Sequence, residues 1–278
     1  MRRSVALLAP AAVPTILVLG VGLAMVVAQS IGLVPVVGGP RLSLDGYRAA
    51  VTDEDLLTSL LLSLAIASAA TLLAVVVGFV AALGVRATKV GGRLLAGAAA
   101  LTIPVPHLVG AAAIGLLLSD SGLVARVLGS PSGQFPQIVG GPWWIAVVLE
   151  FAWKEAAFVA LVVVSVLSRG ADELDETAAV LGAGPWSRLR HISVPLAMPA
   201  LIVAGGVSFV YVLGSYEVSW LLGRAYPEPL PVLAYRLFSS TDLTARPEAL
   251  AVATLTVAVC ASVGVVVLRA LDRALRPA

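Results

Sequence analysis

Six long apolar stretches, nearly free of charged residues, follow one another along the chain. A bilayer core about 30 Å thick needs about 20 apolar residues of α-helix, because each helical residue rises about 1.5 Å. The pattern therefore predicts an all-α polytopic membrane protein with six transmembrane helices. The first stretch is too long for the apolar region of a signal peptide, so we expect it to be retained. The predicted spans are residues 5–28, 56–84, 94–118, 143–167, 198–222 and 249–268.

The composition agrees with burial in lipid and argues against several other classes of protein. The 278 residues are 59% hydrophobic and only 12% charged, and their mean hydropathy is +1.01, whereas soluble domains are about 25% charged. A single cysteine allows no internal disulfide, and two histidines give no metal cluster. The net charge of +2 is too small for charge-driven nucleic-acid binding. We expect one membrane domain over residues 1–278, with no metal and no nucleic-acid partner.

The positive residues predict the orientation of the chain. With the N-terminus in the cytoplasm, eleven of them lie on the cytoplasmic side, six lie outside, and Lys154 lies within a span. Cytoplasmic loops of membrane proteins carry an excess of Lys and Arg, so both termini are expected to be cytoplasmic. The eleven are Arg2, Arg3, Arg86, Lys89, Arg93, Arg169, Arg188, Arg190, Arg269, Arg273 and Arg276.

Motifs for hydrolytic chemistry are absent from the sequence. A nucleotide-binding loop ends in Gly-Lys-Ser or Gly-Lys-Thr, but Lys89 is followed by Val90 and Lys154 by Glu155. The sequence also contains neither HExxH nor GxSxG. We therefore predict that the chain is not an enzyme and has no catalytic residues.

The loop at residues 168–196, between the fourth and fifth spans, has a pattern of its own. Acidic residues at 172–176 mark a helix start, residues 182–185 (GAGP) form a turn, and a basic amphipathic segment follows up to Pro195. The loop is predicted to form two short helices around a glycine elbow, where Gly182 can adopt a positive φ and allow close backbone approach. Glu176 is then a cap, an ion-pair partner or a solvated acid. A simple solvated connector is the alternative for the whole loop.

Three elements of this loop resemble a known motif: Glu176-Thr177-Ala178, Gly182 six residues after the glutamate, and Ile192-Ser193-Val194-Pro195. They resemble the EAA loop of the permease subunits of type I ATP-binding-cassette importers, with Thr177 and Val194 as conservative departures. Together with the number of spans, the resemblance covers residues 56–268. The coupling residues that it implies are Glu176, Thr177, Ala178, Gly182, Ala183, Trp186, Arg188, Ile192 and Pro195.

The resemblance implies a multi-pass permease of the bacterial cytoplasmic (inner) membrane. Its loop would dock as a coupling helix on a separate cytoplasmic ATPase subunit, which would bind ATP and Mg; this chain itself would hold no cofactor. The other implied partners are an extracytoplasmic solute-binding protein and a second permease subunit, either another copy or a related chain. The transported solute stays open among polyamines, thiamine, iron and sugars.

Four charged residues lie within predicted spans: Glu150, Lys154 and Glu155 in the fourth and Glu217 in the fifth. Each costs about 2.5 to 3.5 kcal/mol at the bilayer centre, so a partner, a cavity or a pathway is expected for each. Glu150 and Lys154 are four residues apart, a favourable spacing for an ion pair on one helix. We predict a translocation pathway with an acidic, aromatic lining suited to a cationic or hydroxyl-rich solute. Its residues are Glu150, Lys154, Tyr211, Tyr216, Glu217 and Trp220.

Two further features bear on this region. Pro104, Pro106 and His107 predict a kink in the third span, with His107 as a packed hydrogen-bonding residue rather than a proton relay. A rival hypothesis is a secondary transporter or channel driven by an ion gradient, with Glu150, Lys154 and Glu217 as its coupling charges. A structural membrane scaffold is a third class.

Overall fold

The computed structural model describes residues 2–131, 133–168 and 170–275, and every regular element within them is helical. Side chains are described except those of residues 2–7, 9, 11 and 89. Of the positive residues counted for the orientation, Arg169 and Arg276 therefore lie outside the described residues, as do the side chains of Arg2, Arg3 and Lys89.

The chain divides into two compact units, and α3 (Glu54–Ala87) and α13 (Arg246–Ala274) each contribute to both. Unit 1 comprises residues 1–60 and 229–258, and unit 2 comprises residues 61–228 and 259–278. Unit 1 also contains α1 (Arg2–Ser30), α2 (Asp45–Thr52), α12 (Leu230–Phe238) and η2 (Leu243–Ala245). The other elements of unit 2 are α4 (Lys89–Thr102), α5 (His107–Leu118), α6 (Leu123–Val127), α7 (Ile145–Leu167), α8 (Ala171–Val180), α9 (Pro185–Arg188), η1 (Leu189–Ser193), α10 (Val194–Gly214) and α11 (Glu217–Leu222).

Five helical stretches in the described residues are long and apolar enough to cross a membrane. They are Ala12–Ser30, Glu54–Ala87, His107–Val127, Pro185–Gly214 and Leu243–Ala274. The predicted fourth span corresponds to α7, a helix of 23 residues that carries Glu150, Lys154 and Glu155. Its charge content, not its length, sets α7 apart from the five. The architecture is that of a polytopic membrane protein built from helices.

The predicted third span, residues 94–118, is not one helix. It is interrupted between α4 and α5 at residues 103–106, which include Pro104 and Pro106. Proline has no backbone N–H and its ring clashes with the preceding turn, so two prolines in four residues end α4 instead of bending it. The predicted disruption at this point is confirmed, in the stronger form of a break.

The predicted fifth span, residues 198–222, is not one continuous helix either. Helix α10 ends at Gly214, and α11 begins only at Glu217. At its other end, α10 is preceded directly by α9 and η1, so Pro195 does not end the loop helix as expected. Here η1 is a π-helical turn. At its end the N–H of Val194 donates to Leu189 O, five residues back, as in a π-helix.

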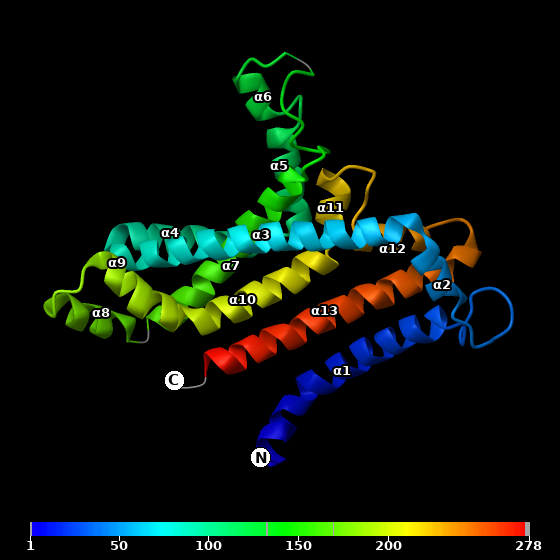
Figure 1. Ribbon diagram of the computed structural model, residues 1–278, viewed down its shortest axis with the longest axis horizontal. Coiled ribbons are helices and arrows are strands. Elements are labelled where there is room, and N and C mark those ends of the chain that lie inside the picture. Colours follow the sequence, from blue (N-terminus) through cyan, green and yellow to red (C-terminus); the bar gives the residue numbers. More distant parts are fainter. Residues whose placement is uncertain (1, 132, 169, 276–278) are drawn as a thin grey trace. The chain divides into compact units, whose positions relative to one another are not determined.

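Helix α7 lies at the centre of unit 2, beside α4, α5 and α10 (Figure 1). Its buried face is rich in small residues, and a Cβ on Gly78 of α3 would lie only 2.7 Å from the backbone oxygen of Ala156. Small residues let apolar helices approach closely where lipid provides no hydrophobic drive between them. The sequence thus packs α7 tightly enough to place its charged residues against neighbouring backbone.

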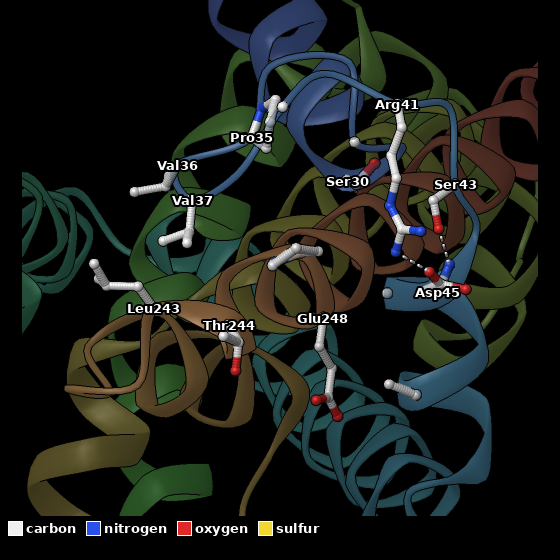
Figure 2. Close-up of a pocket in the computed structure, with 15 residues that line it drawn as sticks. Ser30, Pro35, Val36, Val37, Arg41, Ser43, Asp45, Leu243, Thr244 and Glu248 are labelled. Atoms are coloured by element: carbon white, nitrogen blue, oxygen red, sulfur yellow. Dashed lines mark hydrogen bonds and ion pairs between the residues drawn. The ribbon is translucent and has the colours of Figure 1, made fainter.

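Unit 1 has a separate core between α2, α12 and α13, centred on Ala50, Leu230 and Ala251. Next to it lies a pocket of about 330 Å³, lined by the loop after α1, by α2 and by the start of α13. Figure 2 shows Arg41 directed toward Asp45 in this pocket, with 2.9 Å between Nη2 and Oδ2. The backbone N–H of Asp45 donates to Ser43. The polar side chains of Arg41, Ser43 and Asp45 in this pocket are thus hydrogen-bonded within residues 41–45.

Candidate functional site

The loop at residues 168–196 folds as two short helices, α8 and α9, around a turn at residues 181–184, as predicted. Gly182 has a φ of +86°. Its N–H donates to Ala179 O at 3.0 Å, and the N–H of Ala183 donates to Ala178 O at 2.9 Å. This pair of bonds is a Schellman cap, which needs a left-handed residue at the position of Gly182. The expected close backbone approach is absent, because a Cβ on Gly182 would meet no described atom within 4 Å.

Two ion pairs hold the loop in place. Nη1 of Arg188 lies 2.9 Å from Oδ2 of Asp175, which joins α9 to α8. Arg86, at the end of α3, donates to Asp172 in the first turn of α8, with its Nε 3.2 Å from Oδ1. The Thr177 hydroxyl donates to the backbone oxygen of Glu173. The sequence did not predict these pairings, since they join segments that are 13 and 86 residues apart.

Glu176 is exposed and makes no hydrogen bond or ion pair with the described part of the chain. The loop-internal ion pair considered for Glu176 is made instead by its neighbour Asp175. The Glu176 carboxylate therefore remains available to a partner molecule.

The turn of the loop presents apolar side chains to its surroundings. Val180 is 89% exposed, Leu181 82% and Trp186 73%. Apolar side chains that are exposed at a turn can form part of an interaction surface. We call Val180, Leu181 and Trp186 the loop tip.

A groove of about 390 Å³ lies between α8 and the helical run that starts at α9. It brings together residues from both ends of the predicted motif, Thr177 and Ala178 on one wall and Ile192 and Pro195 on the other. The spacing of the motif thus corresponds to a single surface feature. The complete lining is Leu174, Thr177, Ala178, Leu181, His191, Ile192, Pro195 and Leu196.

The second candidate region is a polar cluster on α7. Lys154 is only 5% exposed, and its Nζ donates to the backbone oxygens of Thr102, at 2.7 Å, and Val105. The favourable spacing of Glu150 and Lys154 does not lead to an ion pair between them in this structure: both residues are described, and each has a different partner. Carbonyls freed by the break between α4 and α5 compete successfully for the ammonium group.

Glu150 is fully buried and contacts His107, the first residue of α5. The distance from Nδ1 of His107 to Oε1 of Glu150 is 3.1 Å. On the other side of the ring, Nε2 lies 3.7 Å from Oε1 of Glu155, which also accepts a hydrogen bond from Ser208. The prediction of His107 as a packed hydrogen-bonding residue is confirmed. Ser208 was missed, because one serine in an apolar stretch carries no distinctive signal.

A cavity of about 230 Å³ adjoins this cluster. Of the six predicted pathway residues, Lys154 and Tyr211 line it, and Glu150 lies behind His107 without exposure. The Tyr211 ring is 4.8 Å from that of His107. The complete lining is Ile103, His107, Lys154, Glu155, Phe158, Val207 and Tyr211.

The remaining three predicted pathway residues lie at the start of α11, past the break that follows α10. The rings of Tyr216 and Trp220 stack with centroids 6.1 Å apart, and Glu217 is exposed beside them. They do not line the cavity at Tyr211. The predicted pathway set thus falls into two groups in this structure.

Comparison with known proteins finds a family that matches the part of the chain with the loop and the polar cluster. A family model described as "Binding-protein-dependent transport system inner membrane component" matches residues 74–277, which contain the loop and the polar cluster. The 2-aminoethylphosphonate transport system permease protein PhnV of Salmonella typhimurium is 32% identical over 109 residues, 39% of this chain and 40% of that protein. The chain thus spans about two fifths of the length of this relative.

Two further similarities extend over more of the chain. The molybdenum transport system permease protein ModB of Azotobacter vinelandii is 27% identical over 194 residues, 68% of this chain and 83% of that protein. A bacterial ABC transporter involved in the import of alginate shares the fold, with a TM-score of 0.72 over 97% of this chain and 93% of that chain, at 19% identity. The predicted resemblance is confirmed, and the chain belongs to the family of binding-protein-dependent transport system inner membrane components.

Proposed function

We propose that this chain is a transmembrane permease subunit of an ATP-driven importer, coupled through the loop at residues 168–196 to a cytoplasmic ATPase. The proposal rests on the fold of this loop and on the exposure of its side chains. One internal ion pair and a glycine cap fix its fold, while Glu176 and the loop tip are exposed and have no hydrogen-bond or ion-pair partner in the described chain. A fixed loop with an exposed apolar tip is suited to dock on another protein.

The connection from the loop into the membrane is short and stiff. Helical backbone runs without a gap from Pro185 through η1 to Gly214, so that a displacement of the loop moves α10 and its Tyr211 directly. The Arg86–Asp172 pair gives the loop a second connection, to α3. ATP-driven closure of the ATPase would thus reach the spans as a rigid-body movement and alternate the side to which the pathway opens.

The topology that fits this mechanism has six crossings and both termini in the cytoplasm. Helix α7 supplies the sixth crossing, which differs from the five apolar stretches in carrying three charged residues. In this arrangement, the loop between α7 and α10 faces the ATPase. The protein is then a multi-pass component of the bacterial inner membrane, and the family description supports that location.

We further propose that solute from outside first passes Tyr216, Glu217 and Trp220 and then reaches the cavity at Lys154 and Tyr211. One structural neighbour is a transporter in complex with a substrate-bound periplasmic protein. It supports an extracytoplasmic binding protein as a partner here, and a second permease subunit completes the proposed assembly. ATP and Mg would be bound by the ATPase. The names of relatives add 2-aminoethylphosphonate, molybdenum, sulfate and trehalose to the solutes to be tried.

The proposal is tested by co-purification of the ATPase subunit with matched variants. Leu181→Asp places a charge in the loop tip, where Leu181 is 82% exposed. Leu128→Asp makes the same change just after α6, where Leu128 is 69% exposed. We expect Leu181→Asp to abolish co-purification and Leu128→Asp to retain it, with both proteins monodisperse. Equal retention of the ATPase by both variants would overturn the proposed docking surface.

A further inference from the structure

The break between α4 and α5 leaves backbone carbonyls without helical partners. The last four carbonyls of an α-helix have no N–H donor within the helix. After Thr102, Pro104 and Pro106 have no N–H to offer, and the break itself supplies Thr102 O only with a long bond of 3.3 Å from the N–H of Val105. In a membrane interior, each unsatisfied backbone group costs several kcal/mol, because no water replaces the missing donor. A break at this place therefore needs donors from elsewhere.

Lys154 of α7 supplies these donors. Its Nζ donates to Thr102 O, at the end of α4, and to Val105 O, within the break. Lys154 is 5% exposed, so its ammonium group is shielded from solvent and is held by the two carbonyls, although the residue also lines the cavity. A cation is also the charge that the C-terminal end of a helix dipole favours.

Helix α7 also contacts the other side of the break, at the start of α5. Glu150, one turn before Lys154, contacts His107 at the first position of α5, where the helix dipole favours an anion. A Cβ on Gly110 would lie 2.8 Å from Oε1 of Glu150, so a glycine in α5 leaves room for this carboxylate. The negative Glu150 thus lies at the N-terminal end of α5 and the positive Lys154 at the C-terminal end of α4, so that each charge suits the helix end that it contacts.

We propose that Lys154 is a positioning residue that fastens the end of α4 to α7, so that α4, α5 and α7 move as one body during transport. Its ammonium group replaces the missing backbone donors of the break and does not bind solute. The fastening follows from the contacts alone, whereas the movement during transport rests on the proposed function.

The test is a distance measurement across the break by pulsed electron paramagnetic resonance. Cys260→Ser removes the only native thiol, and Leu101→Cys and Leu116→Cys place spin labels on α4 and α5 at side chains that are 75% and 74% exposed. The full chain is measured in lipid nanodiscs with Lys154 intact, and with Lys154→Met, Lys154→Arg or Glu155→Gln. Glu155→Gln is the comparison variant, since it removes a charge from the same cavity and keeps a polar group 3.7 Å from His107, while both bonds from Lys154 to the carbonyls of the break remain.

We expect one narrow distance distribution with Lys154, Lys154→Arg and Glu155→Gln. Lys154→Met should broaden it roughly twofold, because Val105 O then loses the Lys154 donor and Thr102 O keeps only the bond from the N–H of Val105. An unchanged distribution in Lys154→Met overturns the fastening. If Lys154→Met does not fold, Lys154→Leu, which has neither a charge nor a hydrogen-bond donor, takes its place, and a native distribution in that variant overturns the proposal.

A second measurement separates this inference from the proposed function. The chain is assembled with its ATPase, and the same two labels are compared in the resting state and in the state trapped with ATP and vanadate. An unchanged α4–α5 distance between the two states is expected if the helices move as one body; a changed distance contradicts it. If no ATPase assembles, the proposed function fails, while the resting measurement still decides whether Lys154 fastens the break.

Discussion

Asp175 and Glu176 are neighbours on α8, but only Asp175 pairs with Arg188, at 2.9 Å between Oδ2 and Nη1. Their side chains therefore have separate roles, one within the loop and one toward a partner. Asp175 and Arg188 are partly exposed, at 31% and 26%, so the pair stabilises the loop only modestly, by about 1 kcal/mol or less.

Asp175→Asn should loosen the loop, and Glu176→Gln should not. We expect faster amide hydrogen exchange over residues 171–193 in Asp175→Asn and unchanged exchange in Glu176→Gln, measured by mass spectrometry on the purified chain. Glu176→Gln should instead weaken co-purification of the ATPase. Equal loosening by both variants would contradict the separation of roles.

Gly182→Ala should destabilise the elbow of the loop. A residue with a side chain costs about 1 kcal/mol or more in the left-handed conformation that Gly182 adopts, at a φ of +86°. Gly184→Ala is the matched control, since Gly184 has a φ of −68° and open space where a Cβ would lie. Titration of the ATPase should show a roughly fivefold weaker affinity for Gly182→Ala, the equivalent of that cost. A similar loss in Gly184→Ala would refute the conformational explanation.

His107→Ala should destabilise the chain strongly, because it leaves the buried Glu150 carboxylate without its partner. Removing one member of a buried pair costs about 3 to 5 kcal/mol. Glu150→Gln keeps a polar group beside His107 and should cost less. Thermal unfolding in detergent, followed by tryptophan fluorescence, gives the order of the two variants. A midpoint for His107→Ala at or above that of Glu150→Gln would be inconsistent with the pair.

Gly223→Ala should disturb the segment before α7. Trp144, 4% exposed and with a φ of +56°, lies against Gly223, and an added Cβ there would overlap its ring. Such overpacking costs about 1 to 3 kcal/mol. Gly214→Ala, at the end of α10 with open space around it, should be neutral. The thermal midpoint of each variant checks this, and an unchanged midpoint for Gly223→Ala would contradict the contact.

Much of the fold was predictable because the bilayer requires long apolar helices, which hydropathy detects directly. The break at residues 103–106 was predictable in place, since its two prolines mark it. The break at Ser215 and Tyr216 was not, because neither residue disfavours a helix strongly enough to mark a boundary.

The candidate site was predictable to a smaller extent. A motif such as the one at Glu176 and Gly182 lies within one segment, so its spacing survives in the sequence. The partners of Lys154 cannot be found from spacing in the same way. Helical spacing identifies Glu150 as a neighbour, whereas Thr102 O and Val105 O are reached only after α4 packs on α7. Side-chain bonds to backbone carbonyls leave no residue pattern to detect.

The most direct test of the account is uptake by proteoliposomes that contain the chain, its ATPase and its second permease, with the binding protein added outside. Labelled 2-aminoethylphosphonate, molybdate, sulfate, trehalose, putrescine, thiamine and iron serve as probes, with either ATP inside the vesicles or a proton or sodium gradient without ATP. We predict uptake of at least one probe that requires ATP and is lost in Leu181→Asp. Uptake that is driven by the gradient without ATP and is unaffected by Leu181→Asp would contradict the account.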